Sequence, residues 1–263
     1  MSRVDLYIKT YIFRFLQTIG RYSDLYLSPP SPLSPSFTLT IPSTVSRFPG
    51  SIDLLFYAPP DYRPGQPSSK NYPLLINYHG GGYSIGHAAD DARWATAVLQ
   101  HHECVIVSVN YRLAPAHPFP TGIEDCVSAI LYLWAHASAL HLDISLTALS
   151  GFSAGGNFTF TSAIRLAQEL DALKARDELE DVEVGKLCGI VAFYPAVDWT
   201  RSREERTRSN PNAKPIGVPK WLAGSFDESY LFPRPGDMRD PLLSPGVAEK
   251  GILREALPGR VVG

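Results

Sequence analysis

The sequence predicts an α/β fold in which helices flank a mostly parallel central sheet. Short runs of mainly apolar residues occur at positions 73–78, 104–109, 145–150 and 187–193. Strands that are apolar on both faces belong to sheets that are covered on both sides. Helical patterns lie between these runs, and an alternation of strand and helix is typical of a parallel sheet.

The N-terminal segment is the first predicted element. Its apolar residues recur at the spacing of a helix: Val4, Ile8, Tyr11, Ile12, Phe15 and Ile19. We expect an amphipathic helix that is docked on its own domain. A helix lying in a membrane interface is the less favoured interpretation, because the polar face is short and only weakly basic. The proline-rich residues 28–35 must be extended. Residues 1–36 are therefore assigned to a helix and linker, and residues 37–263 to one α/β domain.

The remaining elements follow in chain order. Residues 37–41 and 52–57 alternate between apolar and polar side chains, as antiparallel strands do. Helices are expected at about 91–101, 122–139 and 153–170. Residues 198–240 are polar, broken by prolines and longer than ordinary connections, which indicates a lid-like insertion that forms a small cap. Residues 258–263 are typical of the start of a further strand, so the last strand and helix are expected to be missing from this chain.

The composition excludes several classes of protein. Lys and Arg number 24 against 26 Asp and Glu, a formal net charge of −2, which removes the electrostatic basis for a dedicated nucleic-acid binder. The three cysteines are far apart and indicate reduced thiols. No stretch approaches the roughly 20 apolar residues of a membrane span. We expect a cytoplasmic protein, and the sequence leaves its oligomeric state open.

A GxSxG motif is the strongest chemical signal. Gly151, Ser153 and Gly155 follow an apolar strand and precede a predicted helix. A tight strand-to-helix turn exposes the serine hydroxyl above the sheet, and the small residues on either side let the neighbouring backbone pass. This context predicts Ser153 as a nucleophile, beside the positive end of the helix that begins at Ala154.

A second motif, HGGG, ends the strand at 73–78. Three consecutive glycines, Gly80, Gly81 and Gly82, let the backbone approach a ligand and turn its N–H groups inward. Two of these N–H groups, together with that of Ala154, are suited to hold the oxyanion of a tetrahedral intermediate. We expect His79 to orient this loop rather than to act as a general base.

Together these motifs resemble the hormone-sensitive-lipase-like family of α/β-hydrolases, the fold-3 group, and particularly its fungal members. Four segments carry the resemblance: YHGGGY at 78–83, NYRLAPAHPFP at 110–120, GFSAGGN at 151–157 and DPLLSP at 240–245. The resemblance implies an α/β-hydrolase fold and hydrolysis of a small-molecule ester without metal or cofactor, in fungal relatives often within secondary metabolism. By motif position it implies Ser153 as nucleophile and Gly81, Gly82 and Ala154 as oxyanion donors, with His79, Gly80, Gly151 and Gly155 as structural motif residues.

The sequence departs from that family at the catalytic acid and histidine. In the family both follow the DPLLSP segment, whereas all seven histidines here precede Ser153. Without its base, such a triad loses on the order of 10⁴–10⁶ in turnover. We therefore interpret the chain as C-terminally truncated. It predicts a serine carboxylic-ester hydrolase that needs a further segment or a substitute base. The alternative is a catalytically dead member that is a small-molecule binding protein or a non-functional truncated product.

Overall fold

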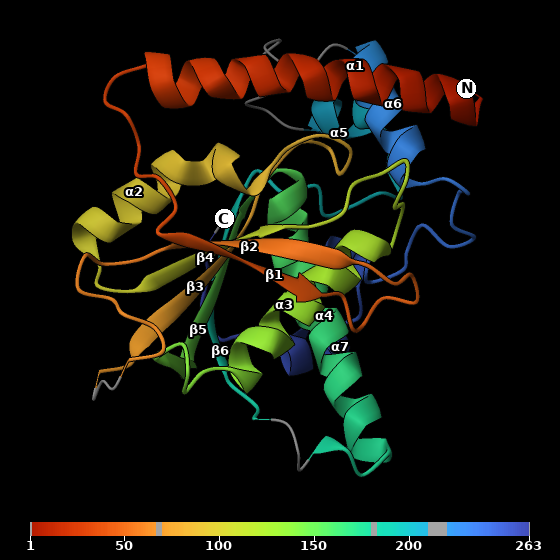
Figure 1. The fold of residues 1–263 in the computed structure, drawn as a ribbon. Coiled ribbons are helices and arrows are strands. Elements are labelled where there is room, and N and C mark those ends of the chain that lie inside the picture. Colours follow the sequence, from red (N-terminus) through yellow and green to blue (C-terminus); the bar gives the residue numbers. More distant parts are fainter. Residues whose placement is uncertain (1, 67–69, 180–182, 210–219, 263) are drawn as a thin grey trace.

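A seven-stranded sheet runs through the centre of the molecule (Figure 1). The computed structural model describes residues 2–66, 70–179, 183–209 and 220–262. In spatial order the strands are β1 (Phe37–Pro42), β2 (Ser51–Tyr57), β4 (Val105–Asn110), β3 (Tyr72–Tyr78), β5 (Leu142–Phe152), β6 (Leu187–Phe193) and β7 (Val261–Val262). The β1–β2 and β2–β4 pairs are antiparallel, and the other four pairs are parallel. The predicted mostly parallel sheet is confirmed, including the short strand β7 at the end of the chain.

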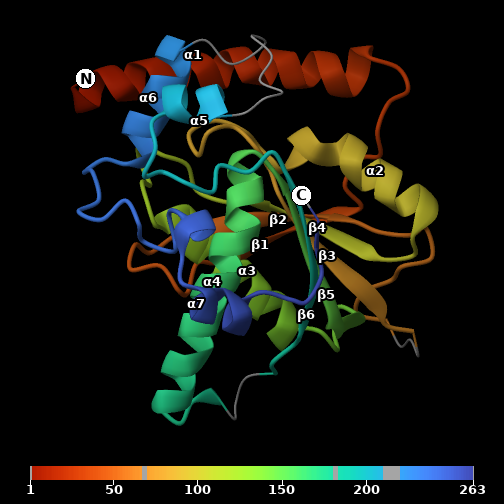
Figure 2. The ribbon, with the colours of Figure 1, turned by 180° about the vertical axis from the view of Figure 1, so that it is seen from behind.

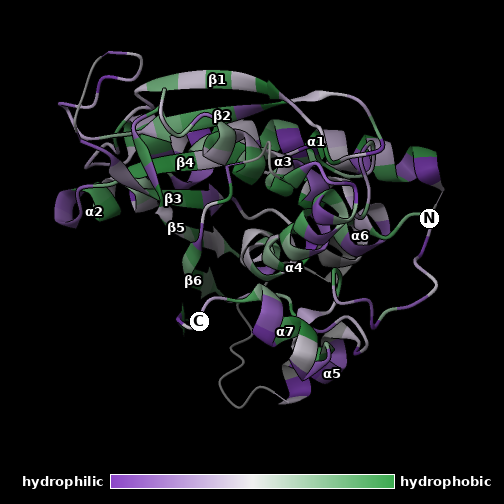
Figure 3. Cartoon of the chain, turned by 90° about the horizontal axis from the view of Figure 1, so that it is seen from below, coloured by the Kyte–Doolittle hydropathy of each residue, from purple (hydrophilic) through white to green (hydrophobic). Residues whose placement is uncertain are grey.

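Helices cover both faces of the sheet, as Figures 1 and 2 show. On one face lie α3 (Thr121–Ala135), α4 (Ala154–Ala175) and α7 (Lys250–Ala256). On the other face lies α2 (Ala92–His101), after the short helix η2 (Ala88–Asp91). A large apolar core fills the space under α3 and α4, and a smaller one fills the space under α2. The central strands are correspondingly coloured largely hydrophobic in Figure 3.

The N-terminal helix forms as expected, but it docks through the opposite face. Helix α1 (Arg3–Tyr22) continues into a π-helical turn, η1 (Ser23–Leu27). Its buried residues are Leu6 and Thr10, whereas the apolar residues that predict the helix, such as Ile8 and Phe15, are more than half exposed. The reason is that polar side chains on the inner face bond to loops of the domain, among them Arg14 to the carbonyl oxygen of Ala114.

The expected lid-like segment contains two helices, α5 (Arg203–Ser209) and α6 (Lys220–Tyr230). Both lie at the same end of the molecule as α1 (Figure 1). The ring of Phe13 on α1 meets that of Phe226 on α6 edge-on, with ring centroids 6.1 Å apart. A short helix, η4 (Pro245–Val247), follows this segment.

A few short stretches of the chain lie outside the described residues. Residues 210–219 of the lid-like segment lie outside the described residues. The same holds for 67–69 in the loop before β3, for 180–182 before β6, and for the first and last residues of the chain. In the part of the chain that is described, all three cysteines are free, and no helix has the length and apolar character that a membrane crossing requires.

Candidate active site

Ser153 occupies a sharp turn between β5 and α4. Its backbone adopts φ +53° and ψ −109°, a left-handed conformation that costs a non-glycine residue about 1–3 kcal/mol. The turn is held from both sides: the Ser153 N–H donates to the carbonyl oxygen of Phe193 at 2.9 Å, and the Asn157 N–H donates to that of Ser153 at 3.0 Å. This anchoring lets the protein maintain a strained serine at the positive end of the 22-residue helix α4.

The loop after β3, residues 79–86, lies directly beside this turn, and we call it the glycine loop. Gly155 lies so close to β3 that a Cβ atom there would overlap the carbonyl oxygen of Tyr78. A Cβ atom at Gly80 would lie 3.7 Å from Cβ of Ser153. Gly151 pairs with Tyr78 across the parallel β3–β5 ladder. The structure therefore brings together the HGGG and GxSxG motifs, which are about seventy residues apart in the sequence.

The three expected oxyanion donors have free backbone N–H groups. Gly81 turns the loop with φ +118°, a conformation that favours glycine, and its carbonyl oxygen accepts from Ser84 N–H and Ile85 N–H. Gly82 packs against the ring of Phe226 on α6. No described residue accepts a hydrogen bond from the N–H of Gly81, Gly82 or Ala154. Free N–H groups beside a serine hydroxyl are what the stabilisation of an oxyanion requires.

His79 is completely buried beneath the glycine loop. Its ring stacks on that of Tyr111 with centroids 4.2 Å apart, and its Nδ1 lies 2.7 Å from the carbonyl oxygen of Gly80. Burial lowers the pKa of His79 to about 3, so its ring is neutral at physiological pH. The Tyr111 hydroxyl in turn donates to the carbonyl oxygen of His79 at 2.7 Å. His79 thus lies among groups that fix the loop rather than beside the serine hydroxyl.

The residue after Tyr111, Arg112, forms a buried ion pair with Asp125. Nη2 of Arg112 lies 2.8 Å from Oδ1 of Asp125, which is fully buried on α3. The Asp125 carboxylate also accepts from the Arg112 N–H and from the Ser43 hydroxyl. The NYRLAP segment is thus bonded to α3 through Arg112 and to the glycine loop through the neighbouring Tyr111.

Sequence reasoning missed a buried polar chain at the carboxyl ends of β3 and β5. Asn77 donates to Oδ2 of Asp91 at 2.8 Å and accepts from the Ser150 hydroxyl at 2.8 Å. Nε1 of Trp94 also donates to the Ser150 hydroxyl. Burial raises the pKa of Asp91 to about 6, although the hydrogen bond from Asn77 acts to lower it. The available signal was the set of polar residues inside otherwise apolar strands.

No described histidine or carboxylate makes a hydrogen bond with the Ser153 hydroxyl. His87 caps η2, where its Nδ1 accepts from the Ala89 N–H. Asp198, which follows β6, accepts from the N–H and the hydroxyl of Thr200. Among the described residues, no three His, Cys, Asp or Glu side chains gather as metal ligands do. The described residues therefore contain the expected nucleophile and the expected oxyanion donors, and none of their histidines or carboxylates is bonded to the serine hydroxyl.

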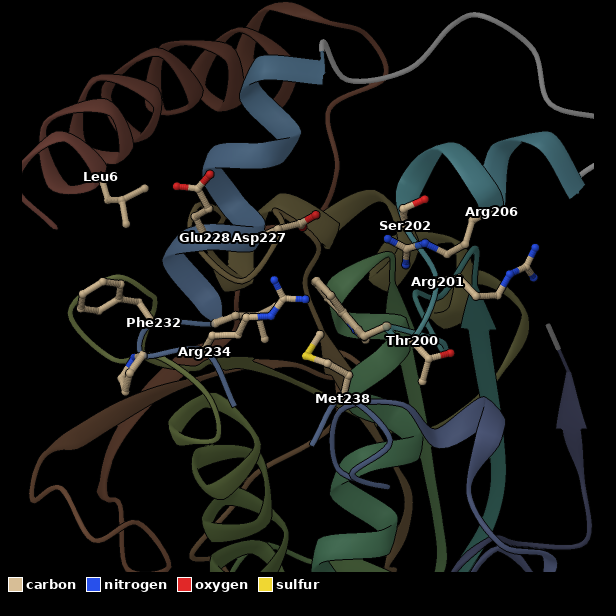
Figure 4. A pocket seen from close by; sticks show the side chains of 13 residues that line it. Leu6, Thr200, Arg201, Ser202, Arg206, Asp227, Glu228, Phe232, Arg234 and Met238 are labelled. Atoms are coloured by element: carbon tan, nitrogen blue, oxygen red, sulfur yellow. The ribbon is translucent and has the colours of Figure 1, made fainter. Parts of the chain in front are cut away.

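A pocket of about 580 Å³ lies beneath α1, between α6 and the segments that flank it (Figure 4). Its lining combines apolar residues, among them Leu6 and Met238, with charged ones, among them Arg201 and Glu228. The lining includes neither Ser153 nor the glycine loop. Trp199 connects the two regions, because it lines the pocket and its ring lies 5.8 Å from that of Tyr83, next to Gly82.

The amino-acid sequence is similar to those of known α/β-hydrolases. A family model described as alpha/beta hydrolase fold matches residues 75–262. The chain is 31% identical over 206 residues to an AB hydrolase superfamily protein of Schizosaccharomyces pombe, covering 72% of this chain and 59% of that protein. It is 40% identical over 100 residues to a carboxylesterase of Mycobacterium tuberculosis, covering 38% of this chain and 31% of the relative.

A solved structure matches along nearly the whole chain. Brefeldin A esterase, described as a bacterial homologue of human hormone-sensitive lipase, superposes with a TM-score of 0.71 at 21% identity. The match covers 99% of this chain and 68% of that protein. At this level of identity the similarity concerns the fold. The chain spans less than two thirds of the length of either sequence relative above.

Proposed function

The chain belongs to the α/β-hydrolase fold family, and from that premise we propose that Ser153 is the nucleophile of a carboxylic-ester hydrolase. The observation that carries the proposal is the strained backbone of Ser153, φ +53°, beside a glycine loop with free N–H groups. Strain at a non-glycine residue persists only where the surrounding structure enforces it, and it is concentrated at functional sites.

In the proposed reaction, the Ser153 hydroxyl oxygen attacks the carbonyl carbon of the ester. The carbonyl oxygen takes up the negative charge, and the N–H groups of Gly81, Gly82 and Ala154 donate to it. The carbon–oxygen bond to the alcohol then breaks, and the alcohol leaves with a proton. Water hydrolyses the resulting acyl-Ser153 and regenerates the hydroxyl. The first half of the reaction needs a group that carries the serine proton to the leaving alcohol, and the second half needs one that carries a proton from water to the serine oxygen as the carboxylic acid leaves. The substrate we propose is a small-molecule ester, and a role in secondary metabolism rests on the sequence resemblance alone.

The test is hydrolysis of p-nitrophenyl acetate by the full chain, beside Ser153→Ala. The matched control is Ser145→Ala, which removes an exposed hydroxyl from the other end of the same strand. Turnover that is lost in Ser153→Ala and kept in Ser145→Ala supports the proposal. Equal rates in all three proteins contradict it for this chain. Labelling of Ser153 by a fluorophosphonate, located by mass spectrometry, tests the nucleophile separately from turnover.

A second candidate function is ligand binding without hydrolysis. It is favoured by the finding that no described histidine or carboxylate bonds to the Ser153 hydroxyl, because a serine without a base is a poor nucleophile near neutral pH. Calorimetric titration with p-nitrophenyl acetate distinguishes the two. Saturable binding that is equal in the wild type and Ser153→Ala, with no release of p-nitrophenol, supports binding alone. Release of p-nitrophenol that depends on Ser153 contradicts it.

A further inference from the structure

Helix α1 presents an apolar face to solvent along its whole length. Eight side chains on this face are between 53% and 66% exposed. They are Val4, Ile8, Tyr11, Ile12, Phe15, Leu16, Ile19 and Tyr22, and we call them the outer stripe. Tyr26 and Leu27 extend the exposed apolar surface into the following turn, at 64% and 68%. Soluble proteins rarely expose contiguous apolar surface of this extent unless it meets a partner.

The helix is held in this orientation by its inner face. Arg14 donates to the carbonyl oxygens of Ser84 and Ala114, both at 2.9 Å. Gln17 donates to Asp90 and accepts from the Gly86 N–H, and Arg21 pairs with Asp90. A rotation that buried the outer stripe would break these bonds and leave polar groups without partners. The exposed apolar face is thus a consequence of specific bonding.

The geometry of the outer stripe indicates whether a second copy of α1 or a lipid surface would cover it. At about 100° per residue its side chains span an arc of roughly 140°, along a helix about 30 Å long. A second copy of α1 packed along it would contact a narrower seam and leave both margins exposed. A lipid surface, in contrast, covers a broad arc of a helix that lies across the top of the molecule in Figures 1 and 2.

The charges around the outer stripe indicate which lipid it fits. Asp5 is the one charged residue within the arc, and it is bonded to Ser2 in a capping box at the end of the helix. Of the four cations of α1, Arg14 and Arg21 are turned toward the domain, Arg3 lies over the rings of Tyr7 and Phe232, and Lys9 lies just beyond the margin of the arc. The burial of apolar area therefore has to drive any association of the outer stripe with a lipid surface. The exposed Tyr11, Tyr22 and Tyr26 have amphipathic rings, which suit the depth of lipid head groups. We propose that the outer stripe of α1 docks on a zwitterionic lipid surface, with the helix axis in the plane of the interface.

Flotation with vesicles of phosphatidylcholine tests this proposal on the full chain. The wild type is expected to float with the vesicles at both 50 mM and 500 mM salt, because apolar contact is little screened. The double variant Ile8→Glu/Phe15→Glu, at the centre of the outer stripe, is expected to lose at least tenfold in partition coefficient. The matched control is Leu146→Glu, which changes a leucine of β5 that is 45% exposed and leaves α1 intact.

Several outcomes would overturn the proposal. A wild type that stays with the buffer, or a double variant that floats as well as the wild type, excludes docking through this face. Flotation that disappears at high salt assigns the association to charge instead. A lipid-free dimer that Ile8→Glu/Phe15→Glu converts to monomer, measured by light scattering, makes a second copy the occupant. Circular dichroism melts of the double variant and Leu146→Glu, matched to the wild type, show that the fold is kept.

Discussion

The side-chain carbonyl oxygen of Gln17 accepts a hydrogen bond from the backbone N–H of Gly86, with 2.6 Å between the two atoms. Gly86 lies at the end of the glycine loop, whose Ile85 N–H bonds back to Gly81. Helix α1, the first element of the chain, is therefore bonded to the loop that carries the expected oxyanion donors. The same helix has its apolar face in solvent, so one element links the outer surface to the candidate site.

Replacing Gln17 by alanine is expected to loosen the glycine loop. The variant leaves the Gly86 N–H without a partner, which costs about 1–3 kcal/mol in a part-buried site. Amide hydrogen exchange in a peptide that covers residues 80–87 should accelerate by about tenfold. Thr18→Ala serves as the control, because that exposed hydroxyl bonds only to its own helix. Unchanged exchange in Gln17→Ala would show that the loop keeps its shape without α1.

Replacing Ser153 by glycine is expected to stabilise the protein relative to Ser153→Ala. Alanine retains the penalty of a positive φ, whereas glycine adopts this conformation without strain. The difference should be about 1 kcal/mol, or a Tm about 3 °C higher for the glycine variant. Differential scanning calorimetry measures it. At Ser145, where φ is not positive, the same pair of substitutions should rank in the opposite order.

Replacing Asp125 by alanine is expected to be severely destabilising. The variant leaves the Arg112 guanidinium, whose side chain is 10% exposed, without its partner. Breaking a buried ion pair on one side costs about 3–5 kcal/mol, which lowers the Tm by about 10 °C. Glu178→Ala, which removes an exposed pair with Arg176, should change stability by less than about 1 kcal/mol. Equal small losses in both variants would contradict the structural role assigned to Asp125.

The carboxyl group of Asp91 should make stability depend on pH. Burial raises its pKa from 3.8 to about 6 in the folded protein. The folded state therefore holds this proton more tightly than the unfolded state does. The resulting stabilisation is fully present below about pH 4 and is lost as pH rises through 6.

Asp91→Asn removes this titration. Between pH 4 and pH 7 the free energy of unfolding of the variant should therefore rise relative to that of the wild type, by about 3 kcal/mol at most. Urea unfolding of both proteins at several pH values measures the difference. Other titrating groups largely cancel in it, because the two proteins share them. A difference that is constant over this range would show that Asp91 has an ordinary pKa.

The sequence was sufficient for those parts of the site that depend on local spacing. The turn at Ser153 follows from an apolar strand, a helix and the small residues between them, and Gly155 is small because β3 passes directly over it. The mixed orientation of the strands also follows from alternation in β1 and β2 and from uniform apolarity in the central strands. These signals are carried by neighbouring residues, so a linear pattern reveals them.

Other parts of the structure depend on backbone groups or on register, which leave no linear pattern. The groups that hold Arg14 are the carbonyl oxygens of Ser84 and Ala114, which every residue type possesses. The apolar spacing of α1 therefore predicted the helix and not the face through which it docks. The pairing of Asn77 with Ser150 likewise requires the register between β3 and β5, which forms only in the folded sheet.

The contact between Arg14 and Ala114 joins residues that are 100 positions apart. During synthesis at about 5–20 residues per second, roughly 5–20 s separate the two residues. The bonds between α1 and residues 84–114 can therefore form only after that stretch of the chain has been made. Through that interval the polar side chains on the inner face of α1 lack these partners, so the docked position of the helix is reached later than the helix itself is made.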